Sequence, residues 1–125
     1  RALRIRRLGF VSPYIAHVSA AIREALEAEG LSIAAFGSFE EAEEHRVARI
    51  APSSILEGVV AVGRAAYCDG VFVSCTNART LEVLPEAEAR LGLPVLSSNQ
   101  ALAWHMMRLA GIDDRRSDLG ALFRA

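Results

Sequence analysis

One cysteine stands among small polar residues directly after an apolar run, and a thiol in that position can do chemistry. The run 71–74 ends at Cys75, and Thr76 and Asn77 follow it. A thiolate is a nucleophile, and it is stabilised where backbone N–H groups and a helix N-terminus face it. Free cysteine is often only a small buried hydrophobic residue, but these polar neighbours favour a reactive thiol. We therefore predict that Cys75 is catalytic and lies at the mouth of a cleft.

Uncharged polar residues also follow the other apolar runs. Ser12 and Tyr14 follow the first run, and Asn99 and Gln100 follow the last. Helix capping by Ser98 or Asn99 accounts for part of this pattern, but it does not explain a cysteine beside them. Parallel sheets bind ligands beyond the carboxyl ends of their strands. The sequence thus predicts a small-molecule site at one edge of a sheet.

The elements that must position these residues alternate along the chain between strand-like and helical periodicity. Predicted strands cover residues 7–12, 31–36, 70–74 and 94–97, and predicted helices cover 14–29, 52–66, 85–92 and 99–110. The acidic segment 40–44 is expected to be a loop or one helical turn. This order predicts an α/β three-layer sandwich, a four-stranded parallel sheet with helices on both faces and right-handed crossovers.

Composition narrows the possible partners. A chain of 125 residues with 52% apolar content fits a single α/β domain spanning 1–125. A net charge of -1 without a basic stripe argues against nucleic acid as a partner. No apolar run approaches the roughly 20 residues of a membrane span, and the start does not resemble a signal peptide. We expect a cytoplasmic protein that does not bind membranes.

Residue types also limit the cofactors. All fourteen basic residues are arginine, so this chain cannot anchor pyridoxal phosphate through a lysine Schiff base. Glycine-rich phosphate-binding signatures are absent, and the cysteines and histidines lack metal-ligand spacing. We expect neither a cofactor nor a metal. Cys68 begins the strand that Cys75 follows, and about 3.3 Å per residue separates them too far for a disulfide, so Cys68 is predicted to be structural.

Three blocks carry a resemblance to a known family. They are VSPYIAHV, VARIAPSSI and VFVSCTNARTLEVLPEAEARLGLPVLSSNQALAWHMMRLAGI. They resemble the carboxyl-terminal half of the aspartate/glutamate racemase superfamily, closest to the branch of maleate cis-trans isomerases and ectoine-utilisation proteins. Arylmalonate decarboxylase is similar through residues 80–98. It lacks the N-Q-A and W-H of residues 99–105 and typically has glycines after its cysteine, so the isomerases fit better.

The resemblance implies cofactor-independent chemistry on a small carboxylic acid held between two similar α/β halves, each supplying one cysteine. Cys75 matches the carboxyl-terminal cysteine. In the isomerases one thiolate adds to the double bond of maleate, a single bond rotates, and the other thiol moves a proton. The resemblance assigns Tyr14 to a substrate carboxylate, and Ser12, Thr76 and Asn77 are further candidate donors to that carboxylate.

One position departs from the family pattern. Glu44 stands where the maleate isomerases tend to have an asparagine that touches substrate, and a carboxylate there would repel a dicarboxylate. This favours the ectoine-utilisation relatives and makes Glu44 a candidate substrate-binding residue.

The chain is shorter than the family it resembles. It begins at Arg1 without methionine, and family members are about twice as long. We therefore expect the carboxyl-terminal half of a two-domain enzyme. This half should be inactive alone and should form a homo-oligomer, a dimer, through the full-length protein. An arylmalonate-type decarboxylase and a non-catalytic ligand-binding α/β domain remain as alternative functions.

Overall fold

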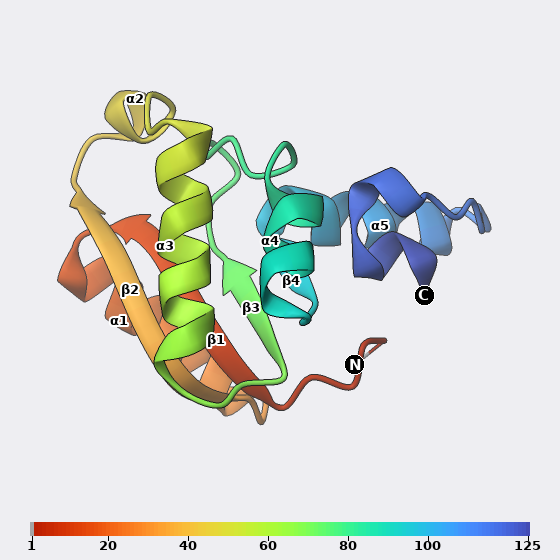
Figure 1. The fold of residues 1–125 in the computed structure, drawn as a ribbon, viewed down its shortest axis with the longest axis horizontal. Coiled ribbons are helices and arrows are strands. Elements are labelled where there is room, and N and C mark those ends of the chain that lie inside the picture. The colour runs from red at the N-terminus through yellow and green to blue at the C-terminus, as the bar shows by residue number, and fades with distance from the viewer. Residues whose placement is uncertain (1) are drawn as a thin grey trace.

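The computed structural model describes residues 2–125, which form a four-stranded, wholly parallel sheet flanked by helices (Figure 1). The strand order is β2-β1-β3-β4. The strands are β1 (Arg7–Tyr14), β2 (Ser32–Glu41), β3 (Gly70–Val73) and β4 (Val95–Ser97). This architecture confirms the predicted α/β class with its four-stranded parallel sheet.

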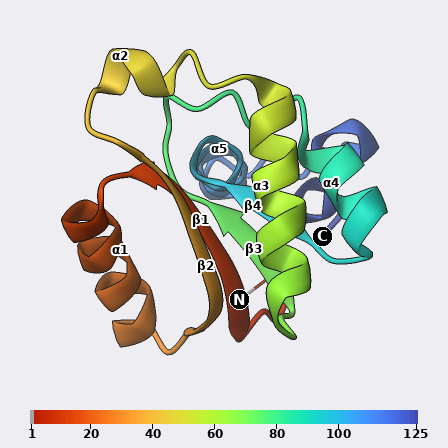
Figure 2. The ribbon, with the colours of Figure 1, turned by 60° about the vertical axis from the view of Figure 1, so that its left-hand side comes forward.

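Helices form the two outer layers. They are α1 (Ala16–Ala28), α2 (Glu44–Val47), α3 (Pro52–Ala65), α4 (Leu84–Leu91) and α5 (Ser98–Leu109), followed by the short 3-10 turns η1 (Ser117–Leu119) and η2 (Ala121–Arg124). Figure 2 shows α3 and α4 on one face of the sheet and α1 on the opposite face. Helices α1 and α5 border the same apolar hollow. Within residues 2–125, every helix is too short or too polar to cross a bilayer.

The central strands are buried on both faces, which explains their unbroken apolar runs. Phe10, Val71 and Val95 are fully buried. Phe10 pairs in register with Phe36 on β2 and Phe72 on β3, and its ring centroid lies 5.5 Å and 6.1 Å from theirs. Stacked rings of this kind contribute about 0.5–1.5 kcal/mol each beyond their burial. This row of rings joins the neighbouring strands β2, β1 and β3 across one face of the sheet.

Three predicted boundaries differ from the structure near the carboxyl ends of the strands. The first strand was predicted to end at residue 12, with a helix from residue 14, but β1 continues to Tyr14 and α1 begins at Ala16. β2 continues to Glu41 because it stays paired with β1 as far as Tyr14. The cap of α5 is Ser97, not Ser98 or Asn99 as predicted. Ser97 keeps an extended backbone, and its Oγ accepts the N–H of Gln100 at 3.3 Å. Ser98 is already helical, so its hydroxyl can serve a residue outside the helix.

The carboxyl-terminal turns η1 and η2, which the periodicity did not predict, are held by a buried carboxylate. Glu88 on α4 is 9% exposed. Its oxygens accept the N–H groups of Val95 and Ala121 and a guanidinium N–H of Arg124 at 2.8–3.1 Å. Charge-assisted hydrogen bonds of this kind are stronger than neutral ones. Glu88 therefore joins α4, β4 and the end of the chain.

Candidate active site

The carboxyl ends of β1, β3 and β4 meet at one edge of the sheet, the upper edge in Figure 1. β1 ends at Tyr14, Cys75 follows β3, and Ser98 follows β4. Val73 pairs with Val11 on β1 and with Ser97 on β4. Because these strands are parallel and in register, residues that are far apart in sequence arrive at the same edge. The structure thus brings together the residues that the sequence placed there.

The thiol of Cys75 is held by its own loop and by α5. Its backbone N–H donates to Oγ of Ser98 at 3.1 Å, and the N–H of Asn77 points at its Sγ at 3.1 Å. The backbone at Cys75 has φ of 131°, outside the range that side-chain-bearing residues normally adopt. Backbone strain of this kind collects at functional sites when the surrounding contacts enforce it. The arrangement fixes the direction of the sulfur and supplies one N–H donor to it.

Tyr14 lies against the thiol. Burial, the adjacent thiol of Cys75 and the nearby carboxylate of Glu44, in that order, raise the pKa of the Tyr14 hydroxyl. Each of these causes disfavours the phenolate. Tyr14 therefore keeps its proton throughout the neutral range and can donate a hydrogen bond to an anion.

Ser12 holds the backbone of this tyrosine through a hydrogen bond. Ser12 is fully buried, and its Oγ accepts the N–H of Tyr14 at 3.1 Å and the hydroxyl of Ser19 at 2.9 Å. The predicted contact of Ser12 with a carboxylate stays a prediction. In this chain its oxygen holds the end of β1 in place.

The rim above the thiol consists of exposed polar residues. Asn77 donates its side-chain amide to the main-chain oxygen of Glu44 at 2.9 Å and to Oε2 of Glu44 at 3.3 Å. The side-chain amide of Asn99 donates to the carbonyl of Thr76 at 2.7 Å. Thr76, Asn77 and Glu44 are exposed to solvent. Two elements therefore fasten the loop that carries Cys75: α2 through Glu44, and α5 through Ser98 and Asn99.

Two of these anchors were not recognised in the sequence as part of the site. Asn99 was placed at this edge without a role in the site, and Ser98 was interpreted as a helix cap, whereas the structure uses both side chains to hold the thiol loop. The available signal was their position after β4, at the same edge as Cys75. Cys68 lies before the start of β3, is 2% exposed, and like Cys75 is a free thiol. This placement agrees with the structural role predicted for it.

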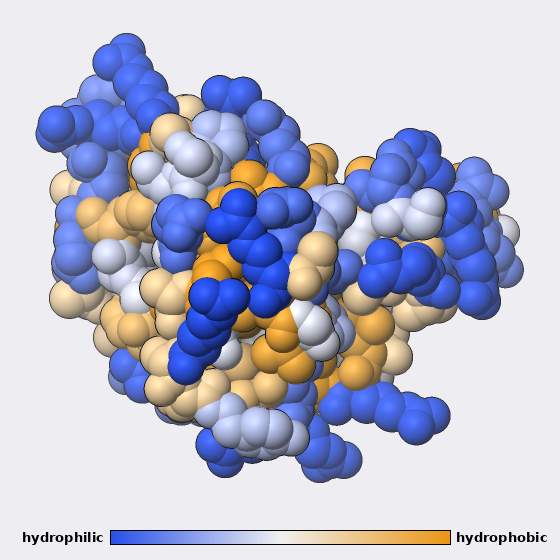
Figure 3. Space-filling model, in the orientation of Figure 1, coloured by the Kyte–Doolittle hydropathy of each residue, from blue (hydrophilic) through white to orange (hydrophobic). Residues whose placement is uncertain are grey.

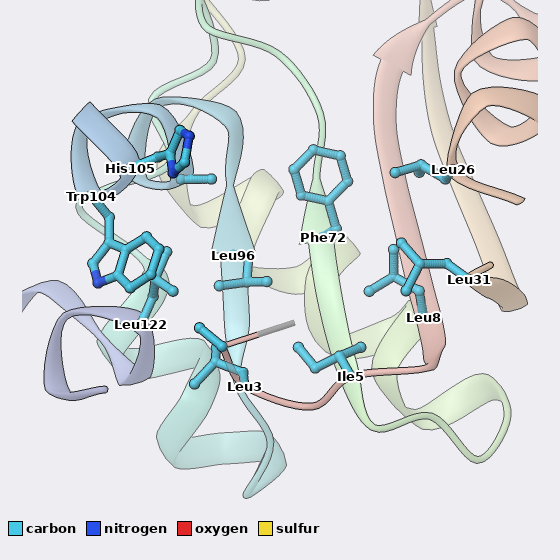
Figure 4. Close-up of a pocket in the computed structure, with 12 residues that line it drawn as sticks. Leu3, Ile5, Leu8, Leu26, Leu31, Phe72, Leu96, Trp104, His105 and Leu122 are labelled. Carbon is cyan, nitrogen blue, oxygen red and sulfur yellow. The ribbon is translucent and has the colours of Figure 1, made fainter. Parts of the chain in front are cut away.

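Access to the thiol differs from the prediction. We expected Cys75 at the mouth of a cleft, but its residue is 3% exposed and packs with the core. An apolar hollow of about 590 Å³ lies elsewhere, between α1 and α5, and Leu8, Phe72 and Leu96 face it (Figure 4). Cys75 does not line that hollow. The sulfur lies one layer beneath the exposed rim, so the rim residues must move or be completed by another surface for a substrate to reach it.

The surface around the rim is polar. Hydrophilic side chains cover the α2 corner, at the upper left in Figure 3, and the carboxyl-terminal end on the right, with apolar surface between them. Among residues 2–125, no cluster of three or more histidine, cysteine, aspartate or glutamate side chains is arranged to hold a metal ion. The groups around the thiol at this edge are therefore a phenol, hydroxyls, amides and the carboxylate of Glu44, with Glu41 at the end of β2.

Comparison with known proteins gives consistent matches. Residues 1–123 match the arylmalonate decarboxylase family. The chain is 35% identical to arylmalonate decarboxylase of Bordetella bronchiseptica over 112 residues, covering 89% of this chain and 47% of that protein. A liganded variant of arylmalonate decarboxylase has a TM-score of 0.93 at 34% identity, covering 98% of this chain and 53% of that chain. A variant of Nocardia farcinica maleate cis-trans isomerase with a covalently bound succinylcysteine intermediate has a TM-score of 0.88 at 28% identity, covering 99% of this chain and 51% of that chain.

The matches confirm the predicted superfamily and its maleate isomerase branch. They also include the decarboxylase, at a higher identity than the isomerases. The chain spans about half the length of the curated relatives it matches.

Proposed function

We propose a function on the premise that the chain belongs to the arylmalonate decarboxylase family. It is part of a cysteine-dependent isomerase that acts on a small carboxylic acid, with Cys75 as the reacting thiol. The observation that carries the proposal is the setting of this sulfur. The N–H of Asn77 lies 3.1 Å from the Cys75 Sγ, and Oγ of Ser98 accepts the backbone N–H of Cys75.

The chemistry suits an unsaturated acid. The Cys75 sulfur adds to the carbon–carbon double bond, and the electron pair of that bond moves toward the adjacent carboxylate. The former double bond can then rotate before the carbon–sulfur bond breaks again and returns the thiolate. Negative charge grows on the carboxylate during addition, and hydrogen-bond donors placed there lower the barrier. The donors that we assign to this task are the Tyr14 hydroxyl and the side-chain and backbone donors of Thr76 and Asn77.

One relative supports this mechanism directly. The Nocardia farcinica maleate cis-trans isomerase was solved with a succinylcysteine intermediate. A succinyl group on sulfur is what thiol addition to a four-carbon unsaturated diacid produces. We carry this chemistry to Cys75 as a proposal.

Decarboxylation of an arylmalonate is the second candidate. The 35% identity to the decarboxylase and the family match over residues 1–123 favour it. In this reaction a carboxylate leaves as carbon dioxide, and the thiol of Cys75 would donate a proton to the carbanion that remains. Carbon dioxide release from a substituted malonate separates this reaction from isomerisation, which releases none.

The second half of the site is part of the proposal. Because the chain spans about half of its relatives, we propose that another α/β half of the full-length protein closes over the rim and supplies a second thiol. The chain on its own should then fold without turning over substrate. Assaying it beside the full-length protein tests this point.

The decisive experiment uses the intact protein. Maleate, aspartate, glutamate, hydantoins and arylmalonates are offered to the wild type and to the Cys75→Ser and Cys68→Ser variants. We expect Cys75→Ser to abolish turnover and Cys68→Ser to keep it. We also expect iodoacetamide to label Cys75 faster than Cys68 at neutral pH. A Cys75→Ser protein with wild-type activity would refute Cys75 as the reacting thiol. No turnover of any of these acids by the wild type, together with a Cys75 thiol that never labels, would support a non-catalytic binding domain instead.

A further inference from the structure

Glu44 places a carboxylate at the rim of the thiol site. It is the first residue of α2, and this short helix is fixed by Val47, which is fully buried. The Glu44 side chain lies at 3.3 Å from the amide nitrogen of Asn77, whose backbone N–H points at the Cys75 sulfur. The carboxylate is therefore only one residue away from the reacting atom.

This charge has neutral partners. The acidic residues nearby contact basic side chains: Glu41 forms an ion pair with Arg46 at 3.6 Å, and Glu43 lies 3.2 Å from the imidazole of His45. Within residues 2–125, Glu44 has no such ion pair. Its contacts are the neutral amide of Asn77 and the neutral hydroxyl of Tyr14. An ionised carboxylate can accept about four hydrogen bonds, so Glu44 retains capacity for a donor that arrives with the substrate.

We propose that Glu44 determines substrate specificity, by selecting an acid that carries one carboxylate and, at its other end, an amide or ammonium group that donates to Glu44. This inference rests on the proposed function and specifies its substrate class. The substrate carboxylate faces the neutral donors Tyr14, Thr76 and Asn77, and the N–H donor faces Glu44. A second carboxylate in that place would meet a like charge without a cation to offset it.

The size of the effect follows from Coulomb's law. Two unit charges about 4 Å apart repel by roughly 1 kcal/mol in bulk water and by several times more in a partly dehydrated site. Glu44 is exposed in this chain, so the lower end applies. We expect a preference of about fivefold for the N–H donor over the second carboxylate.

Two saturated four-carbon probes measure this preference without requiring turnover. Succinate carries two carboxylates, and succinamate replaces one of them with an amide of nearly the same shape. Calorimetric titration of the intact protein should give a Kd for succinamate about fivefold lower than for succinate. Glu44→Gln keeps the shape and removes the charge, and it should bring the ratio of the two Kd values close to one.

A neighbouring glutamate provides the matched control. Glu43 is exposed and pairs with His45, so Glu43→Gln removes the same charge from the same segment and should leave the wild-type ratio unchanged. The proposal is overturned if the wild type binds succinate as well as succinamate, if neither probe binds, or if Glu44→Gln leaves the ratio unchanged. These outcomes concern binding, whereas the proposed function fails separately if Cys75→Ser retains activity.

Discussion

The positive φ at Cys75 should make this position respond to glycine differently from an ordinary buried cysteine. Cys75 has φ of 131°, and holding a non-glycine residue in such a conformation costs about 1–3 kcal/mol. Cys75→Gly removes that strain, and Cys75→Ala keeps it. Both variants lose the thiol, so the difference between their free energies of unfolding reports only the backbone conformation and one methyl group.

The same two substitutions at Cys68 measure the contributions of alanine and glycine that do not depend on backbone strain. It is 2% exposed, a free thiol like Cys75, and has no positive φ. There, replacing alanine by glycine should cost about 0.5–1 kcal/mol in backbone entropy and about 0.8 kcal/mol for the lost buried methyl. The same two costs apply at Cys75, where the released strain opposes them. The alanine-to-glycine change in the free energy of unfolding at Cys75 should therefore be about 2 kcal/mol more favourable to glycine than the same change at Cys68.

Urea titration followed by circular dichroism gives the free energy of unfolding for all four variants. We expect Cys68→Gly to be about 1.5 kcal/mol less stable than Cys68→Ala, and Cys75→Gly to be at least as stable as Cys75→Ala. With about 2.1 cal/mol/K of unfolding entropy per residue over 125 residues, 2 kcal/mol corresponds to roughly 8 °C in Tm. Equal alanine-to-glycine differences at the two cysteines, within about 0.5 kcal/mol, would refute the claim that the thiol sits on a strained backbone.

Two further predictions each compare a variant with a control variant at a nearby residue. Ser98→Ala removes the acceptor of the Cys75 N–H and should weaken the thiol loop by about 1 kcal/mol, so that iodoacetamide labels the buried thiol roughly fivefold faster through local opening. Ser97→Ala removes only the cap of α5 and should lower stability by about 1 kcal/mol without changing that rate; equal labelling rates in the two variants would contradict the assigned anchor. Glu88→Gln removes the buried charge and turns one of its two acceptor oxygens into a donor facing Ala121 and Arg124. We expect a loss of about 2 kcal/mol, which lowers Tm by about 8 °C. Glu86→Gln on the same helix loses an exposed pair with Arg90 and should shift Tm by at most about 4 °C in differential scanning calorimetry; a similar shift in both variants would refute the anchoring role of Glu88.

The order and type of the main elements could be predicted from local pattern. The central strands are buried on both faces and therefore unbroken in their apolar character, and helices such as α3 carry an apolar stripe that begins at a proline. Gly92 ends α4 with φ of 67°, as its position after the apolar pattern indicated. Element ends were less predictable. β2 runs on to Glu41 only because β1 continues beside it, and a single strand does not encode the length of its neighbour.

The side-chain partners within the site were decided by tertiary structure. Asn77 meets Glu44 across 33 positions, and Cys75 meets Ser98 across 23. Local periodicity carries no information about such pairs, because they depend on the strand order β2-β1-β3-β4 and on how each loop turns after its strand. For the same reason Ser98 could be read as a helix cap, since a serine that precedes a helix has the same local sequence whether it caps that helix or holds a distant loop.

What the sequence by itself determined is the α/β architecture and the collection of a cysteine, a tyrosine and small polar residues at the carboxyl ends of its strands. That much follows from periodicity and from the common direction of parallel strands. Only the tertiary structure decided that the Cys75 sulfur lies beneath the rim, on a strained backbone fastened by α2 and α5. The burial of this sulfur and the strain of its backbone arise from the packing of segments that are distant in the chain, and no single stretch of sequence specifies either of them.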